Sequence, residues 1–138
     1  MMLPRLSLAL VLLALASVGT AADGRKPRLD VRASPRVVFS PARVLLTAEL
    51  VGGEVTEDFH CPGVDWDWGD GTHSFHEEDC PPFAPGMEME RRFTASHAYA
   101  IPGDYRVKVI LRRANRSVAA AGTSVLVQSG FGDGDSDN

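Results

Sequence analysis

The sequence predicts an all-β fold in which two sheets pack face to face, and three observations support this. Several segments of the 138-residue chain alternate apolar and polar residues, which is the pattern of half-buried strands. Glycines and prolines that form turns separate these segments at short intervals. No segment has the periodicity of a convincing helix. About seven short strands with frequent turns favour a β-sandwich of immunoglobulin-like type.

The first 22 residues are expected to be a cleavable signal peptide rather than part of the fold. Arg5 gives a basic start, Leu6–Val18 is apolar, and Gly19–Ala22 has the small residues of a cleavage region. A helical membrane span needs about 20 apolar residues, which is longer than this run. We therefore expect cleavage after Ala22, or else after Ala21, and no membrane insertion of the mature chain. A retained membrane anchor is the less favoured alternative.

Composition divides the rest of the chain into three parts. Residues 23–27 are polar and are predicted to be a flexible linker, and residues 28–128 are predicted to form one sandwich domain. Residues 129–138 are acidic and rich in glycine, so they are predicted to be disordered. Loss of the signal peptide removes Arg5 and no acidic residue, which changes the net charge from −4 to −5. Because phosphates bind basic surfaces, we expect no nucleic acid among the partners.

Segments in which apolar and polar residues alternate are predicted to be the strands. The segment Arg43–Val51 is expected to bury one face, made of Val44, Leu46, Ala48 and Leu50. The segment Met87–Tyr99 alternates in the same way and is expected to share one face among Met87, Met89, Phe93, Ala95 and Tyr99. The segment Tyr105–Arg112 is expected to place on one face Tyr105, Val107, Val109 and Leu111. The sequence RRANRS after it predicts a hairpin loop that leads to a last strand at about residues 117–127.

The stretch VDWDWGDGTHSF, residues 64–75, is predicted to be a strand that runs into a tight turn. Trp66 and Trp68 are two residues apart and are expected to point into the core, whereas Asp65 and Asp67 point away. The Asp-Gly pair that follows is a preferred pair for a two-residue hairpin turn, in which both residues have positive φ.

Two motifs of the sequence resemble those of the PKD domain, and they occur in the same order as in that family. The family is named after polycystic kidney disease proteins, and its domains have an immunoglobulin-like sandwich fold. The first motif comprises Trp66, Asp67, Trp68, Gly69, Asp70 and Gly71. The second comprises His97, Tyr99, Pro102, Gly103, Tyr105 and Val107. Together the motifs are fairly specific, and the resemblance covers about residues 29–128. It implies that His97 is structural and that Tyr105 is the corner tyrosine of such folds.

The chain departs from the family pattern at two places. Trp68 replaces the usual Phe, and the segments EDFHCPG and HEEDCPPFAPG are longer and richer in Cys and His than the pattern requires. The resemblance implies an extracellular spacer or binding accessory, with proteins or polysaccharides as the usual ligands. Fold-level analogy does not establish function, and it covers the loops around these two segments least.

Cys61 and Cys80 are the two cysteines of the sequence, and a chain bound for an oxidising compartment most simply pairs them. The predicted disulfide closes a loop of about 20 residues, which contributes roughly 3 kcal/mol in the chain-entropy model. The alternative is a site for Zn²⁺ or copper, since imidazole and carboxylate groups flank the cysteines. Its candidate ligands are His60, His73, His76 and Glu77, with Glu78 and Asp79 nearby. We favour the disulfide and expect no cofactor.

The aspartates near the turn and His97 each have a chemical and a structural interpretation. Converging carboxylates at Asp65, Asp67 and Asp70 would suit Ca²⁺, but we favour hydrogen bonds from turn amides to Asp67 and Asp70. His97 is a candidate proton carrier, yet no serine or cysteine nucleophile with a glycine elbow accompanies it. We expect its ring to hydrogen-bond near the turn. Nothing in the sequence suggests a cleft, and we expect the protein not to be an enzyme.

The predicted function is that of a secreted or periplasmic binding or adhesion module for an extracellular or cell-surface protein or polysaccharide. The loops at His60–Pro62 and His76–Pro85 combine charges with aromatic side chains that can anchor a ligand. The candidate anchors are Phe59, Phe75 and Phe83. The alternative is a metal-binding protein of the cell envelope that uses the same His-, Cys- and acid-rich loops.

Overall fold

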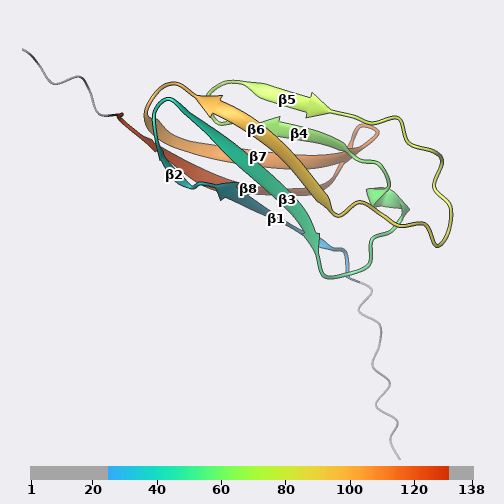
Figure 1. Cartoon of the computed structure of the whole chain (residues 1–138). Coiled ribbons are helices and arrows are strands. Elements are labelled where there is room, and N and C mark those ends of the chain that lie inside the picture. The colour runs from blue at the N-terminus through green and yellow to red at the C-terminus, as the bar shows by residue number, and fades with distance from the viewer. Residues whose placement is uncertain (1–24, 131–138) are drawn as a thin grey trace, which may run out of the picture.

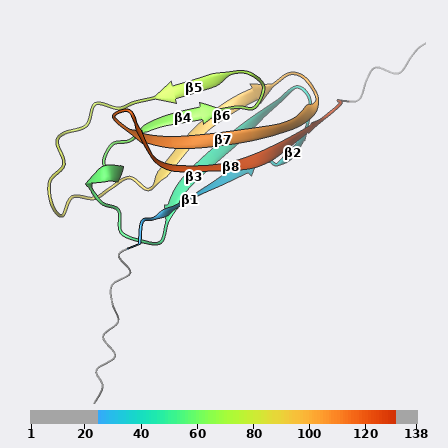
Figure 2. The ribbon, with the colours of Figure 1, turned by 180° about the vertical axis from the view of Figure 1, so that it is seen from behind.

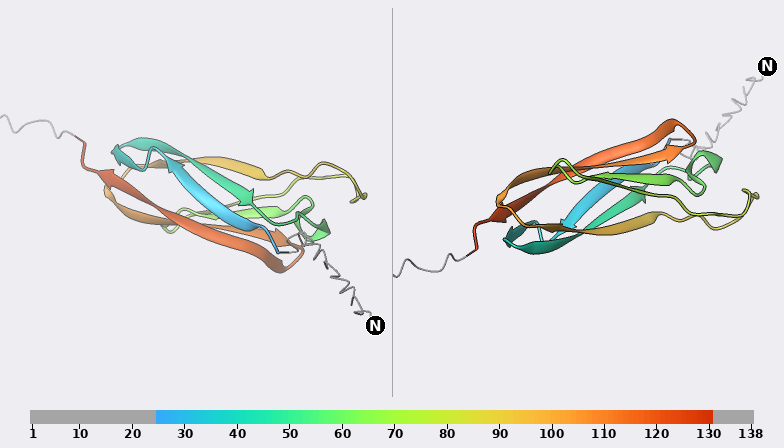
Figure 3. Two further views of the ribbon diagram at one scale, coloured as in Figure 1. Left: turned by 90° about the horizontal axis from the view of Figure 1, so that it is seen from below. Right: turned by 90° about the horizontal axis from the view of Figure 1, so that it is seen from above.

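The computed structural model describes residues 25–130, and these residues form two β-sheets that pack as layers (Figure 1, Figure 3). They contain eight strands and one short 3₁₀ helix, η1, at Glu57–Phe59. The prediction of an all-β fold with two packed sheets is confirmed for these residues. Eight strands agree with the predicted number of about seven. Pro35 separates β1 (Arg28–Ser34) from β2 (Val37–Phe39), because a proline cannot donate a ladder hydrogen bond.

The smaller sheet has three strands in the order β1 (Arg28–Ser34), β3 (Ala42–Val51) and β6 (Arg92–Tyr99). The central strand β3 pairs antiparallel with both neighbours. β1 and β6 are therefore the two edges of this sheet.

The larger sheet has five strands, and Figure 2 shows it from its outer side. Their order is β2 (Val37–Phe39), β8 (Arg116–Gln128), β7 (Gly103–Arg113), β4 (Gly63–Asp67) and β5 (His73–His76). β2 runs parallel to β8, and the other pairs are antiparallel. β2 and β5 are the edges, so β5 and β6 border the same open side of the sandwich (Figure 1).

The core lies between the sheets and follows the alternation of the sequence. The predicted face of β3 is buried, and it consists of Val44, Leu46, Ala48 and Leu50. On β7 the predicted face buries Val107, Val109 and Leu111, while Tyr105 is half-buried. Trp66 and Trp68 are 2% and 1% exposed, as their spacing predicts. Burial of each large apolar side chain contributes about 2 kcal/mol, so this pattern determines which face of each strand turns inward.

β6 is shorter than the predicted strand Met87–Tyr99, because it begins at Arg92. The residues before it, 77–91, form no strand. Three prolines, Pro81, Pro82 and Pro85, lie in this segment and cannot donate ladder hydrogen bonds. The alternation at Met87 and Met89 therefore continues without a neighbouring strand, and both side chains are half-buried.

The turn between β4 and β5 differs from the predicted two-residue hairpin. Residues 68–72 connect the two strands, and the Trp68 N–H donates to the Thr72 carbonyl at 3.1 Å. Positive φ occurs at Gly69 (78°) and Gly71 (87°) but not at Asp70, so the prediction of two consecutive positive φ angles is wrong. The later hairpin prediction is confirmed, because two residues join β7 to β8.

Gly69 and Gly71 give a matched pair of variants for this turn. A Cβ atom at Gly69 would meet the backbone oxygen of Arg106, whereas a Cβ atom at Gly71 would meet nothing within 4 Å. Gly71→Ala should cost about 1 kcal/mol for its positive φ. Gly69→Ala should cost about 2 kcal/mol more, because β7 must move. Urea unfolding of both variants measures the difference, and equal stabilities would contradict the close approach of this turn to β7.

The ends of the described chain are attached to the sandwich. The Glu54 N–H donates to the carbonyl of Arg25 at 3.1 Å, and Pro27 is buried. The predicted linker is thus held to the domain at residues 25–27. The Gly130 N–H donates to the Ser40 hydroxyl at 3.4 Å. The predicted signal peptide and most of the predicted acidic tail lie outside the described residues.

Candidate binding site

The two sequence motifs meet in a stack of aromatic rings. Trp66 on β4 stacks on Trp68 with ring centroids 5.6 Å apart, and Trp68 stacks on His97 of β6 at 4.5 Å. Tyr99 contacts the edge of the His97 ring at 4.8 Å and stacks on Tyr105 of β7 at 4.4 Å. Because β4 and β7 belong to one sheet and β6 to the other, the stack joins the two layers.

Hydrogen bonds around Asp70 attach the turn to β6. His97 Nε2 lies 2.7 Å from Asp70 Oδ2, and the Thr72 N–H and hydroxyl both donate to Asp70 Oδ1. Asp67 Oδ1 accepts the Gly69 N–H at 3.0 Å. The interpretation of both aspartates as acceptors for turn amides is confirmed, and so is the expected hydrogen bond of His97 near the turn.

Two tyrosines complete this cluster. The Tyr99 hydroxyl donates to the carbonyl of Trp68 at 2.7 Å inside the core. The Tyr105 hydroxyl donates to the carbonyl of Ile101, which is the geometry of a tyrosine corner. The indole Nε1 of Trp68 donates to the Ser74 hydroxyl at 2.9 Å. The motif residues therefore hold the sandwich together.

Two pKa shifts follow from this cluster. Burial raises the pKa of Asp70, but hydrogen bonds from Thr72 and His97 outweigh it and hold that pKa below its ordinary value of 3.8. Burial, together with the negative charge of Asp70, raises the pKa of Tyr99 to about 12. Asp70 is thus ionised and Tyr99 neutral near pH 7, and neither group titrates where a general acid or base works best.

Asp70→Asn should lower the free energy of unfolding by about 1–2 kcal/mol near neutral pH, because hydrogen bonds to a charged acceptor are lost. A lowered folded-state pKa gives stability that is present above the unfolded-state pKa and is lost as pH falls through the folded-state pKa. The difference from the parent should therefore shrink below about pH 4. Urea unfolding from neutral to acid pH tests this, with exposed Asp104 as the control position for Asp104→Asn. A difference that persists unchanged into acid would contradict the prediction.

The disulfide between Cys61 and Cys80 is present, as predicted, and attaches residues 77–91 to the start of β4. His60 is buried, and its Nε2 donates to the carbonyl of Pro81 across 2.7 Å. Its ring also contacts Phe83 edge-on at a centroid distance of 5.8 Å. The Arg113 guanidinium in turn donates to the carbonyl of His60. His60 is therefore a structural contact of this segment.

The three candidate aromatic anchors have different positions. Phe59 is 2% exposed and belongs to the core, so its prediction as a binding residue is wrong. In the 3₁₀ helix η1, Phe59 points inward, whereas Asp58 points outward and pairs with Arg116 at 2.6 Å. Phe75 is 57% exposed on β5, and Phe83 is half-buried. The Phe75 ring lies over Gly63 on the outer face of the larger sheet, beside its cross-strand partner Asp65.

The structure does not bring the candidate metal ligands together. His60 contacts the Pro81 carbonyl, whereas His76 Nε2 lies 3.4 Å from Glu78 Oε1. His73 Nδ1 lies 3.9 Å from a carboxylate oxygen of Asp65. Glu77 is exposed, and across residues 25–130 no three His, Cys, Asp or Glu side chains group as a metal site would require.

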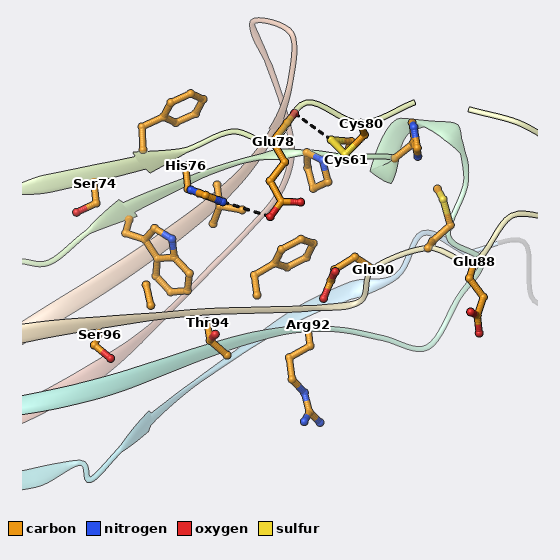
Figure 4. A pocket seen from close by; sticks show the side chains of 18 of the residues that line it. Cys61, Ser74, His76, Glu78, Cys80, Glu88, Glu90, Arg92, Thr94 and Ser96 are labelled. Carbon is orange, nitrogen blue, oxygen red and sulfur yellow. Dashed lines mark hydrogen bonds and ion pairs between the residues drawn. A yellow bond between two sulfur atoms is a disulfide. The ribbon is translucent and has the colours of Figure 1, made fainter. Parts of the chain in front are cut away.

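A cleft of about 680 Å³ lies between β5 and β6, although the sequence analysis suggested none (Figure 4). Val64, Trp66 and Trp68 line its floor. β5 contributes Ser74, Phe75 and His76, and β6 contributes its first five residues, Arg92–Ser96. The disulfide and the segment 77–91 close one end. The signal that could have revealed the cleft is the proline-rich segment between the two strands, which leaves both strand edges uncovered.

Acidic side chains gather at the closed end of the cleft. They are Glu78, Glu88 and Glu90. Among the residues that line the cleft, Arg92 is the single arginine or lysine, and it pairs with Glu49 at 3.5 Å. The cleft therefore combines an apolar floor with negative charge at one end.

No protein-family model matches the sequence, and no curated protein is significantly similar to it. Within the described part of the chain, no helix has the length and apolar character that a membrane crossing requires.

Proposed function

We propose that this chain is a secreted or periplasmic binding module without enzymatic activity, built on a PKD-like, immunoglobulin-like sandwich, which binds a protein or a polysaccharide. The observation that carries the proposal is the cleft between β5 and β6. A concave site with an apolar floor and a few polar groups at its rim is the usual form of a ligand site.

The motif cluster supports the family part of the proposal. The residues that resemble the PKD motifs contact one another through rings and hydrogen bonds, although they are up to 31 residues apart. The parallel pairing of β2 with β8 and the corner geometry of Tyr105 also agree with an immunoglobulin-like sandwich. In this arrangement the motifs stabilise the fold, and the cleft is left for ligand recognition.

The disulfide supports the location outside the cytoplasm. Disulfides persist in secreted and periplasmic proteins and are rare where thiols are kept reduced. The Cys61–Cys80 bond holds the wall of the cleft, so the binding site itself depends on an oxidising environment.

The side chains of the cleft favour binding over catalysis. A carboxyl that acts as a general acid is usually shielded from water, whereas the Glu78 side chain is 69% exposed. His97 is stacked on Trp68, hydrogen-bonded to Asp70 and absent from the cleft lining, so it does not face a ligand there. We therefore assign recognition, and not bond cleavage, to this cleft.

Binding of the oxidised full chain to a glycan array and to a displayed-peptide library tests the proposal. We expect ligands from at least one of the two classes. His76→Ala should weaken their binding by about tenfold, because His76 carries an exposed ring that lines the cleft and points into it (Figure 4). His73→Ala is the matched control, since His73 is a comparably exposed histidine on the same strand, outside the cleft lining. An absence of ligands from both classes, or equal losses in both variants, would contradict the proposal.

A further inference from the structure

We propose that the cleft takes an extended, positively charged peptide segment, which adds as a new strand to the free edge of β6. This inference rests on the binding function proposed above and specifies its ligand. Peptides recognised in this way pair their backbone with a sheet edge and place alternate side chains in pockets.

The backbone of β6 offers the required donors and acceptors. Just before β6, the Leu50 N–H donates to the Arg91 carbonyl at 2.8 Å. In an antiparallel pair, hydrogen-bonded and non-hydrogen-bonded positions alternate, so the backbone groups of Thr94 and Ser96 point away from β3. In the described part of the chain, β6 has no strand neighbour on that side.

The cleft follows this free edge. Five consecutive residues of β6, Arg92 to Ser96, line it, and so do three consecutive residues of β5, Ser74 to His76. Neighbouring residues of a strand point to opposite faces, so a cleft lined by consecutive residues runs along the edge of the strand. Figure 4 shows the labelled residues of the two strands on opposite sides of this space. An extended peptide has the shape that fits between two strand edges.

The charges at the closed end favour a cationic peptide. Within residues 25–130, Glu88 and Glu90 have no ion-pair partner, and Glu78 lies near His76 alone. Arg92 does not neutralise the negative charge of these glutamates, because it pairs with Glu49 and points away from His76 in Figure 4. Lysine or arginine at one end of the peptide would complement these carboxylates and speed its association.

The apolar lining favours a peptide over a polysaccharide. Met87, Met89 and Phe93 line the cleft and are half-buried, and methionine adapts to varied side chains because it is unbranched and flexible. A sugar ring would need an open aromatic face, but Trp66 and Trp68 are covered. The indoles therefore form the floor and are not stacking platforms.

The charge part of the inference is tested with a labelled peptide that alternates valine and threonine and carries two lysines at each end. Fluorescence anisotropy with the oxidised full chain should show binding that weakens as salt rises. The double variant Glu88→Gln, Glu90→Gln should weaken binding about fivefold. The control pair Glu54→Gln, Asp104→Asn removes the same charge from exposed residues outside the cleft lining and should change binding less than about twofold. Equal losses in the two pairs would overturn the role of the acidic end.

The backbone part is tested by changing the peptide rather than the protein. Methylation of alternate peptide amides on one edge keeps every side chain and should reduce binding at least about tenfold. Binding of the unmodified peptide should slow hydrogen exchange at the Thr94 and Ser96 amides. Thr94→Pro should abolish binding, while Ala98→Pro, an edge position of β6 outside the cleft lining, should not. If Thr94→Pro fails to fold, the methylated peptide still decides the question.

The outcomes separate this inference from the function on which it rests. Undiminished binding of the methylated peptide, or unchanged exchange at Thr94 and Ser96, would overturn strand addition. Glycan ligands that are lost in His76→Ala, with no binding of the lysine peptide, would overturn the inference and leave the proposed function standing. No binding by either class of ligand would overturn both.

Discussion

Replacement of Trp68 by alanine should lower the free energy of unfolding by about 4 kcal/mol, the largest single loss we expect in this protein. The substitution removes a ring that is 1% exposed and that stacks on both Trp66 and His97. It also leaves the Ser74 hydroxyl without its indole donor. Urea unfolding followed by far-ultraviolet circular dichroism measures the loss.

Trp68→Phe is the control for this prediction. A phenyl ring keeps apolar contact in the stack but cannot donate to Ser74, so the expected loss is about 1–2 kcal/mol. The loss in Trp68→Phe reflects mainly the hydrogen bond, and the additional loss in Trp68→Ala reflects the aromatic ring. If Trp68→Ala lost less than about 1 kcal/mol, the aromatic stack would not be the main link between the sheets.

Replacement of both cysteines by serine should cost about 3 kcal/mol, because the unfolded chain then regains the freedom of a loop of about 20 residues. It should also weaken ligand binding, since residues 77–91 close one end of the cleft and the Cys61–Cys80 bond holds them. Ordering that segment on binding would oppose association. Urea unfolding and peptide anisotropy on the same protein measure the two effects.

Phe83→Ala separates the disulfide from the other contacts of this segment. The variant keeps the bond and removes a half-buried ring that contacts His60. Its stability should fall by about 1 kcal/mol, clearly less than in the double serine variant. A double serine variant that unfolds at the same urea concentration as the parent would show that the bond does not stabilise the native state.

The strands and their buried faces could be predicted from the sequence because the alternation of residues records which face turns inward. Val44 and Leu46 on β3, and Val107 and Val109 on β7, are buried for this reason. The turn before β5 was less predictable. The local preference of Asp-Gly for a two-residue hairpin is overridden by contacts of the turn with Arg106 and His97, which are distant in the sequence.

The candidate site was harder to predict, because it depends on contacts that alternation does not record. Phe59 lies among charged residues, as a surface anchor would, yet the short turn η1 directs it inward. Phe75 faces solvent in a similar sequence environment. The cleft itself arises because residues 77–91 form no strand between β5 and β6. An unfilled position beside a strand has no residues of its own, so the proline-rich break at residues 81–85 is the one local sign of the cleft.

The described chain enters the sandwich at one end of its long axis and leaves at the other (Figure 1, Figure 3). A protein fused before residue 25 or after residue 130 would extend the particle lengthwise. Such fusions would arrange the domains in a line along this axis. The cleft between β5 and β6 lies along the side of the sandwich, so we expect it to stay accessible in each domain.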